Sequence, residues 1–216
     1  MDEHISPSYK HEKLESPSHE DLVDVFEDAW KHFVFAPVEM LLHHPNGDIA
    51  AMTVLSSYFE AVWSYLTGED SDRKSSVFFV KGFCQVFMSG GVGSEKVAQC
   101  IYKHIRCGLT HAGMPTHKVN YSRSGAKAFY LTYPKKPDGT LNLEAPVRSI
   151  IVNPLRMYEG VIQHFNRYVS KLRAADDQNL VDSFQRTSHR LWGIGAEENI
   201  VGMTEDEFLG RISQRE

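Results

Sequence analysis

Apolar residues recur every three or four positions along most of this chain, a spacing typical of amphipathic α-helices. The stripe is clearest in residues 49–66, where it comprises Ile49, Met52, Leu55, Tyr58, Phe59, Val62, Trp63 and Leu66. The same spacing marks five further long segments and a short one: 20–34, 72–88, 95–111, 153–173, 177–192 and 204–212. We therefore expect a mainly α-helical protein whose helices pack as an antiparallel bundle.

Local residues predict where several of these helices begin or bend. Ser18 precedes the first segment as an N-cap, with Asp21 three residues later as an imperfect capping box. Asn153 and Pro154 open a later helix, because proline fits the first helical turn. Pro37 lies between two apolar stretches and is expected to kink or restart the helix there.

The spacing of apolar residues changes from a helical to an alternating pattern in residues 127–152. KAFYLTYP (127–134) and TLNLEAPVRSIIV (140–152) alternate and are rich in aromatic and β-branched residues, as strands are. KKPDG (135–139) between them has the proline, aspartate and glycine of a turn. The pattern predicts a helical domain with an inserted β-hairpin at about 127–152.

The two ends of the chain differ in composition. Residues 1–19 are rich in Ser, Pro, His, Glu and Lys and hold few apolar side chains. Such a segment buries little, so we expect a flexible N-terminal tail. Residues 20–216 should form a single domain, because 216 residues of 42% hydrophobic composition suffice for one sizeable core.

The formal net charge of −5 and the pI near 6.1 exclude a protein that coats itself in nucleic acid, since such proteins are basic overall. A local basic site for a short stretch of RNA is compatible with this charge. The three cysteines, Cys84, Cys100 and Cys107, do not fit a disulfide-rich secreted scaffold. The polar N-terminus is unlike a secretory signal, and no apolar run reaches the roughly 20 residues of a membrane span. We expect a cytoplasmic protein that does not bind a membrane.

Two patterns that bind cofactors elsewhere are incomplete here. Cys100, His104, Cys107 and His111 form a helical stripe of zinc-binding types, but its length of about 16 Å is too great for one ion. SGGVGSEK (89–96) is a glycine-rich loop before a helix, yet it lacks the spacing of a phosphate-binding P-loop. We expect neither a metal nor another cofactor.

The segment IYKHIRCGLTHAGMP (101–115) holds residue types suited to chemistry on RNA. Arg106 offers a planar fork of donors for a phosphate, and the imidazole of His111 can transfer a proton. The histidine would deprotonate a 2′-hydroxyl or protonate the leaving oxygen, while the arginine stabilises charge on the phosphorus. The simpler alternative is that Arg106 neutralises a helix C-terminus and His111 caps it.

This Arg-x4-His segment resembles the signature motif of the HEPN superfamily, the higher-eukaryote and prokaryote nucleotide-binding helical domains. Arg106, Gly108, Leu109 and His111 match the motif, whereas Cys107 stands where an asparagine is common. Outside the motif the likeness is one of helix layout, and it extends over residues 20–175.

HEPN domains are helical bundles, usually dimeric, in which two Arg–His motifs form a shared, metal-independent ribonuclease site. The resemblance implies Arg106 and His111 as catalytic residues, with Glu60 and Tyr102 as weaker candidates for binding. It also implies a homodimer that acts on RNA. Many such proteins belong to toxin–antitoxin or phage-defence systems, so an antitoxin or another regulatory protein is an implied partner.

Two alternatives stay open. Some HEPN domains are inactive and only bind RNA or protein, and Cys107 together with the acidic charge favours such a non-catalytic module. Positions five apart on a straight α-helix point about 140° apart. Arg106 and His111 would therefore meet within one chain only if the helix deforms near Gly108. Otherwise each works with its counterpart from a second copy, and activity requires a dimer.

Overall fold

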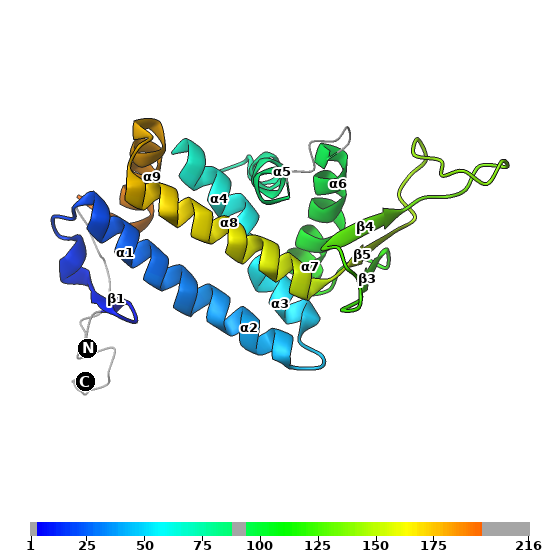
Figure 1. Cartoon of the computed structure of the whole chain (residues 1–216), viewed down its shortest axis with the longest axis horizontal. Helices are drawn as coiled ribbons and strands as arrows, with labels where there is room; N and C mark the ends of the chain where they lie inside the picture. Colours follow the sequence, from blue (N-terminus) through cyan, green and yellow to red (C-terminus); the bar gives the residue numbers. More distant parts are fainter. Residues whose placement is uncertain (1–3, 88–93, 196–216) are drawn as a thin grey trace, which may run out of the picture.

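The computed structural model describes residues 4–87 and 94–195, and within them the protein is mainly helical with two small sheets (Figure 1). A long rod runs through α1 (His19–Ala29), the π-helix η2 (Trp30–Phe35) and α2 (Ala36–His43), and α8 (Pro154–Ala174) lies beside it. The other helices are η1 (His11–Leu14), α3 (Asp48–Leu55), α4 (Ser57–Thr67), α5 (Ser75–Val86), α6 (Ser94–Ile101), η3 (Tyr102–Arg106), α7 (Cys107–Ala112) and α9 (Gln178–Trp192).

The apolar stripe of residues 49–66 faces the core, as its period predicts. Met52, Leu55, Phe59 and Val62 are at most 3% exposed. Burial of each such side chain stabilises the fold by about 1.5–3 kcal/mol relative to an exposed position.

Aromatic rings from four parts of the chain meet in this core. The ring centroid of Phe165 in α8 lies 5.5 Å from that of Phe26 in α1 and 4.9 Å from that of Phe35 in η2. Phe26 lies 5.3 Å from Phe184 of α9, and Phe35 lies 6.0 Å from Tyr58 of α4. Edge-on and tilted pairs of this kind add about 0.5–1.5 kcal/mol each to the burial of apolar area. The cluster therefore fixes α1, α4, α8 and α9 relative to one another.

The helix expected over 49–66 is divided at Ser56 into α3 and α4. The hydroxyls of Thr53, Ser56 and Ser57 each donate to a backbone carbonyl three or four residues earlier. Hydroxyls that bond back to the helix in this way bend it. The apolar period alone did not indicate this break.

The restart expected at Pro37 takes the form of a change of helix type, because the α-helix α2 begins at Ala36 directly after a π-helix. The preceding residues, Trp30–Phe35, are π-helical, and Pro37 lies in the first turn of α2. A proline ring clashes with the carbonyl four residues earlier in a regular α-helix. The wider π-helical turn accommodates the ring, so the rod stays continuous.

The three-stranded sheet has the order β3 (Val119–Tyr121), β5 (Ser149–Val152), β4 (Phe129–Thr132). β4 and β5 pair antiparallel as predicted, with Phe129 opposite Val152. The predicted turn at KKPDG (135–139) is confirmed, since the Gly139 amide donates to the Lys136 carbonyl at 2.9 Å and Lys135 pairs antiparallel with Leu141. The strands are shorter than expected, and residues 133–148 leave the sheet as a long projecting arm (Figure 1). β3, which the sequence did not indicate, pairs parallel with β5. The buried side chain of Val152 faces the helices, and the Phe129 ring lies 5.2 Å from that of Phe83 in α5.

Residues 4–18 are not the loose tail expected from their composition. They form η1 and the strands β1 (His4–Ser6) and β2 (Tyr9–Lys10). The nearly buried carboxylate of Asp28 accepts hydrogen bonds from the Ser6 hydroxyl at 2.6 Å and the Ser8 amide at 2.8 Å. Burial alone would raise the pKa of Asp28, but these hydrogen bonds hold it below its usual value. Hydrogen bonds to Asp28 hold this segment in place, and the spacing of apolar residues in the sequence therefore could not reveal its attachment.

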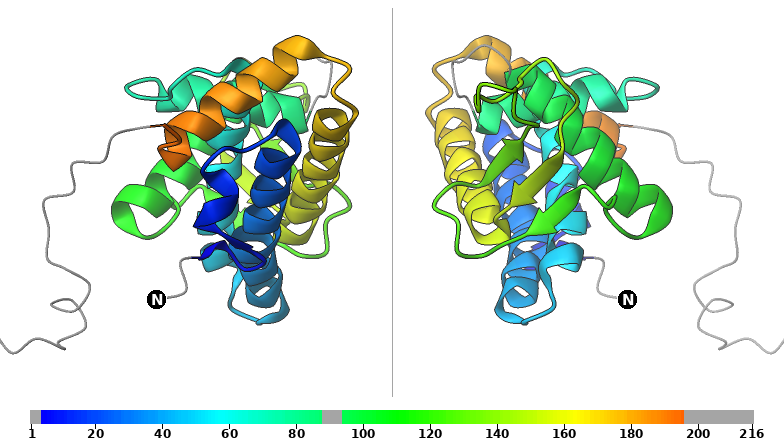
Figure 2. Two further views of the ribbon diagram at one scale, coloured as in Figure 1. Left: turned by 90° about the vertical axis from the view of Figure 1, so that its left-hand side faces the viewer. Right: turned by 90° about the vertical axis from the view of Figure 1, so that its right-hand side faces the viewer.

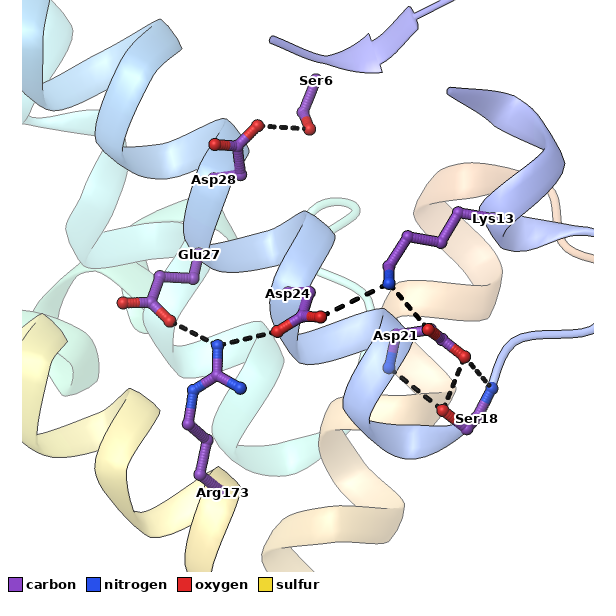
Figure 3. A network of polar contacts seen from close by, with 8 residues as sticks. All are labelled: Ser6, Lys13, Ser18, Asp21, Asp24, Glu27, Asp28 and Arg173. Atoms are coloured by element: carbon purple, nitrogen blue, oxygen red, sulfur yellow. Dashed lines mark hydrogen bonds and ion pairs between the residues drawn. The ribbon is translucent and has the colours of Figure 1, made fainter. Parts of the chain in front are cut away.

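Ion pairs extend this attachment along α1 (Figure 3). Lys13 reaches Asp21 at 2.7 Å and Asp24 at 3.3 Å, and Arg173 of α8 reaches Asp24 at 2.9 Å and Glu27 at 2.7 Å. The Asp24 carboxylate thus forms ion pairs with both the N-terminal segment and α8. The capping box predicted for α1 is confirmed, with the Asp21 carboxylate accepting from the Ser18 amide.

The predicted helix 204–212 lies outside the described residues. Within the described ranges, no helix has the length and apolar character needed to cross a membrane.

Replacement of Asn153 by alanine should destabilise the fold by about 2 kcal/mol. Its buried side chain accepts from two amides of the first turn of α8 and donates to the carbonyls of Arg123 and Gly125. Denaturant unfolding would measure the loss, with Asn166→Ala on the exposed face of α8 as the control. Equal stability of the two variants would contradict this role.

Stability should fall as the pH is lowered from 7 to 5, because of His164. Burial, with Arg167 and Lys171 nearby, lowers the pKa of this histidine to about 4. The unfolded chain takes up this proton near pH 6.5, so acid favours unfolding between pH 6.5 and 4. The half-buried ring is partly screened, and the expected loss is on the order of 1 kcal/mol. In thermal unfolding, His164→Asn should reduce the dependence of stability on pH. An unchanged pH profile would refute His164 as the cause of the acid destabilisation.

Candidate site around Arg106

The motif lies on one continuous helical stretch, α6–η3–α7, that ends at Gly113 with φ of +68°. Ile101, Ile105 and Leu109 point into the core and are at most 4% exposed. Residues Tyr102–Arg106 are π-helical, and the amide of Cys107 donates to the carbonyl of Tyr102. π-Helical turns are rare and are frequent at functional sites.

Arg106 contacts both residues that were weaker candidates in the sequence. Its Nη2 lies 3.1 Å from Oε2 of Glu60 on α4, and its guanidinium carbon lies 5.7 Å from the ring centroid of Tyr102. The same Glu60 oxygen accepts from the hydroxyl of Ser75, at 2.6 Å. Ser75 is the first residue of α5, so three helices contribute to this cluster. The side chains of Arg106 and Glu60 are 23% and 20% exposed, and their charges are therefore less screened than at an open surface.

Arg106 and Glu60 line a pocket of about 360 Å³. Its volume lies within the roughly 300–1,000 Å³ that small ligands occupy. Arg190 of α9 lines the same pocket and lies 3.5 Å from Asp70. Six serine and threonine residues contribute to the polar wall: Thr53, Ser56, Ser57, Ser64, Ser71 and Thr110. Glu60 and Asp70 line the pocket as well, and each pairs with one of the two guanidinium groups. A phosphate ester would therefore bind these guanidinium groups in competition with the carboxylates.

His111 is not brought into this pocket. It is exposed and makes no hydrogen bond or ion pair within the part of the chain that the structure describes. α7 (Cys107–Ala112) continues directly from Arg106, which has α-helical backbone angles, so the side chains of Arg106 and His111 point about 140° apart. One copy of the chain thus presents the arginine in a pocket and the histidine on a separate exposed surface.

The helix does not deform at Gly108, where the sequence allowed it to, but earlier, at Tyr102–Arg106. Position 108 requires a glycine for a different structural reason. A Cβ atom there would lie 2.7 Å from the carbonyl oxygen of Met114, because the chain folds back against the helix. Thr116 holds this returning segment, donating through its amide to the carbonyl of His104 at 3.0 Å.

The zinc-type stripe forms no metal cluster. Among residues 4–87 and 94–195, no three His, Cys, Asp or Glu side chains converge as metal ligands. Cys84, Cys100 and Cys107 are free thiols, and burial raises the pKa of the first two. His104 instead pairs through Nδ1 with the hydroxyl of Thr116 at 3.0 Å.

The sequence did not indicate Ser75 or Arg190. Ser75 contacts Glu60 across 15 positions and Arg190 comes from the far end of the chain, so neither pairing has a local pattern. One indication was available for Glu60 itself. A carboxylate within an apolar helix needs a cationic or hydroxyl partner when it is partly buried.

A double-mutant cycle should show that Glu60 and Arg106 are energetically coupled. Glu60→Gln and Arg106→Gln, alone and together, should give a coupling energy on the order of 1–2 kcal/mol in denaturant unfolding. The control is Arg156 and Glu159, the same residue types at 51% and 49% exposure, for which about 0.3 kcal/mol is expected. Similar coupling in both cycles would contradict a specially held Arg106.

Comparison with known proteins leaves the site to be interpreted from its own residues. No family model, curated protein or solved structure matches this chain.

Proposed function

We propose that this chain is a metal-independent endoribonuclease of HEPN type, built as an antiparallel helical bundle of that family. The observation that carries the proposal is the position of Arg106. Its guanidinium lines a hydroxyl-rich pocket, on the helix whose next turn presents an exposed histidine. Phosphate recognition and proton transfer are the two functions that RNA cleavage requires.

The reaction follows from these two residues. A phosphate of the RNA backbone binds Arg106 through two parallel hydrogen bonds, in place of part of its contact with Glu60. The His111 imidazole takes the proton of the adjacent 2′-hydroxyl, and the 2′-oxygen attacks phosphorus. The bond from phosphorus to the 5′-oxygen breaks, that oxygen takes up a proton from water, and the His111 imidazolium returns its proton to solvent. The products are a 2′,3′-cyclic phosphate and a 5′-hydroxyl end.

The opposite directions of Arg106 and His111 favour a site made by two copies. In a two-fold symmetric dimer every contact between the subunits occurs twice. If Arg106 of one subunit faces His111 of its partner, then His111 of the first subunit faces Arg106 of the partner. His111 is exposed and makes no hydrogen bond or ion pair within the described ranges, so it is available to face Arg106 of the other copy. Thr110 and Leu191 line the Arg106 pocket and are exposed, so a second copy has access to its rim.

A non-catalytic RNA- or protein-binding module is the second candidate. Arg106 is neutralised by Glu60 in this structure, and Cys107 replaces the common asparagine of the motif. Either function fits a toxin–antitoxin or phage-defence system with an antitoxin or regulatory protein as partner. The two candidates differ in whether RNA is cut.

Purified protein should cleave a mixed pool of RNA in the presence of EDTA and leave cyclic phosphate ends. Arg106→Ala and His111→Ala should each lower the rate at least about a hundredfold, because each removes a group that acts in the transition state. His11→Ala, an exposed histidine of η1 outside the motif helix and the sheet, is the control and should cleave like the unchanged protein. Intact RNA in all reactions, or equal cleavage by His111→Ala, would reject the nuclease.

A further inference from the structure

The overall charge of −5 hides a strong separation of charge along the chain. Residues 94–148 contain nine Lys and Arg but only three Asp and Glu, a formal charge of +6. The remaining 161 residues therefore carry −11. A protein that is acidic overall thus contains one basic quarter, the segment that also holds Arg106.

This segment builds one end of the molecule. It comprises α6, η3, α7, β3, β4 and the arm of residues 133–148, which lie together at one end in Figure 1. The right-hand view of Figure 2 looks onto this end, with the sheet and the motif helix side by side. Lys96 of α6 joins the helix to the arm, because its Nζ donates to the carbonyl of Leu143 at 3.1 Å.

Most cations at this end lack an acidic partner. Five exposed residues make no ion pair within the described chain: Lys103, Lys127, Lys135, Lys136 and Arg148. Of the three acids in this segment, Glu95 pairs with Lys81 at 2.8 Å, Asp138 accepts from Thr140, and Glu144 forms no ion pair with these cations in the described chain. Elsewhere in the described chain most cations do pair with carboxylates, among them Lys13, Lys31, Lys74, Arg156 and Arg173.

Two of the lysines at this end act electrostatically on a histidine. Burial lowers the pKa of His104, and Lys118, Lys103 and His117 lower it further. A cluster of like charges without counterions is unfavourable in isolation and is relieved by a polyanion. The charge at this end therefore favours a phosphate-rich partner.

The same end exposes an aromatic ring on a polar sheet face. Tyr130 of β4 is 51% exposed, while its neighbours Phe129 and Leu131 face the helices. Across the sheet it lies opposite Ile151, which in turn pairs with the exposed Asn120 of β3. An exposed ring on a sheet flanked by cations is a common platform for stacking an unpaired base.

We propose that the end formed by residues 94–148 binds single-stranded RNA, with the arm lysines Lys135 and Lys136 on backbone phosphates and Tyr130 stacked on a base. The choice of RNA rests on the proposed function, and the surface would deliver the strand to the motif helix. Single strands are favoured over duplex because stacking on Tyr130 requires a base that is free of its partner.

Binding is measured by fluorescence anisotropy with a labelled 20-nucleotide unstructured RNA in EDTA. The full-length chain carries His111→Ala, so that cleavage does not interfere. Adding Lys135→Gln and Lys136→Gln should weaken binding about tenfold and lower the salt slope by about 1.4, roughly 0.7 for each lost phosphate contact. The control adds Lys31→Gln and Lys74→Gln, which remove the same charge from the acidic part of the molecule. It should bind within about twofold of the starting protein.

Stacking is tested in the same assay. Tyr130→Ala should lose about tenfold in affinity, whereas Tyr130→Phe retains the ring and should bind normally. The proposal is overturned by arm variants that bind like the starting protein, by an equal loss in the control, or by tighter binding of a duplex of the same length. Equal losses for Tyr130→Ala and Tyr130→Phe would overturn the stacking role. Because binding is read without cleavage, this surface can fail while the nuclease stands, and the nuclease can fail while this surface stands.

Discussion

The aromatic contacts of Phe165 determine where the other helices of this protein lie. Its ring packs against Phe26 and Phe35, and these two connect it to α9 and α4 through Phe184 and Tyr58. Since α4 is fixed by this cluster, Glu60 on its opposite side has a fixed position as well. The ion pair between Glu60 and Arg106 is possible only because the core sets the distance between α4 and the motif helix.

That ion pair has two consequences for the proposed chemistry. It holds the guanidinium in a defined orientation, and Ser75 shares the same carboxylate oxygen, which limits its freedom further. It also neutralises the charge that a phosphate would bind, so substrate must compete with Glu60. A site arranged in this way favours a ligand with two phosphate oxygens and further contacts outside the pocket. The basic end of the molecule is the region where such contacts are proposed.

Local sequence predicted the features that depend on local interactions. Asn153 and Pro154 indicated the start of α8, and the structure places that helix at Pro154–Ala174. The antiparallel pairing of β4 with β5 was likewise visible in the alternation of aromatic and β-branched residues. Glu60 and Tyr102 came from the family resemblance, and both contact Arg106.

Features that depend on distant or polar contacts were not predictable. The attachment of residues 4–18 relies on polar contacts with Asp28. The chain that returns past Gly108 approaches it through backbone atoms, which leave no periodic pattern of apolar residues in the sequence. The length of the arm was not predictable either, because KKPDG forms the turn that its residues indicate but β4 and β5 end several residues away from it. The charge separation was present in the sequence, but the net charge of the whole chain concealed it.

The central claim is that Arg106 of one copy acts with His111 of another, and complementation tests it most directly. Arg106→Ala and His111→Ala proteins, each inactive alone, are unfolded, mixed in equal amounts and refolded together. Half of the resulting dimers are mixed, and each mixed dimer regains one of its two sites. The account predicts a return of about one quarter of the normal cleavage rate. A mixture as inactive as its two components would contradict it.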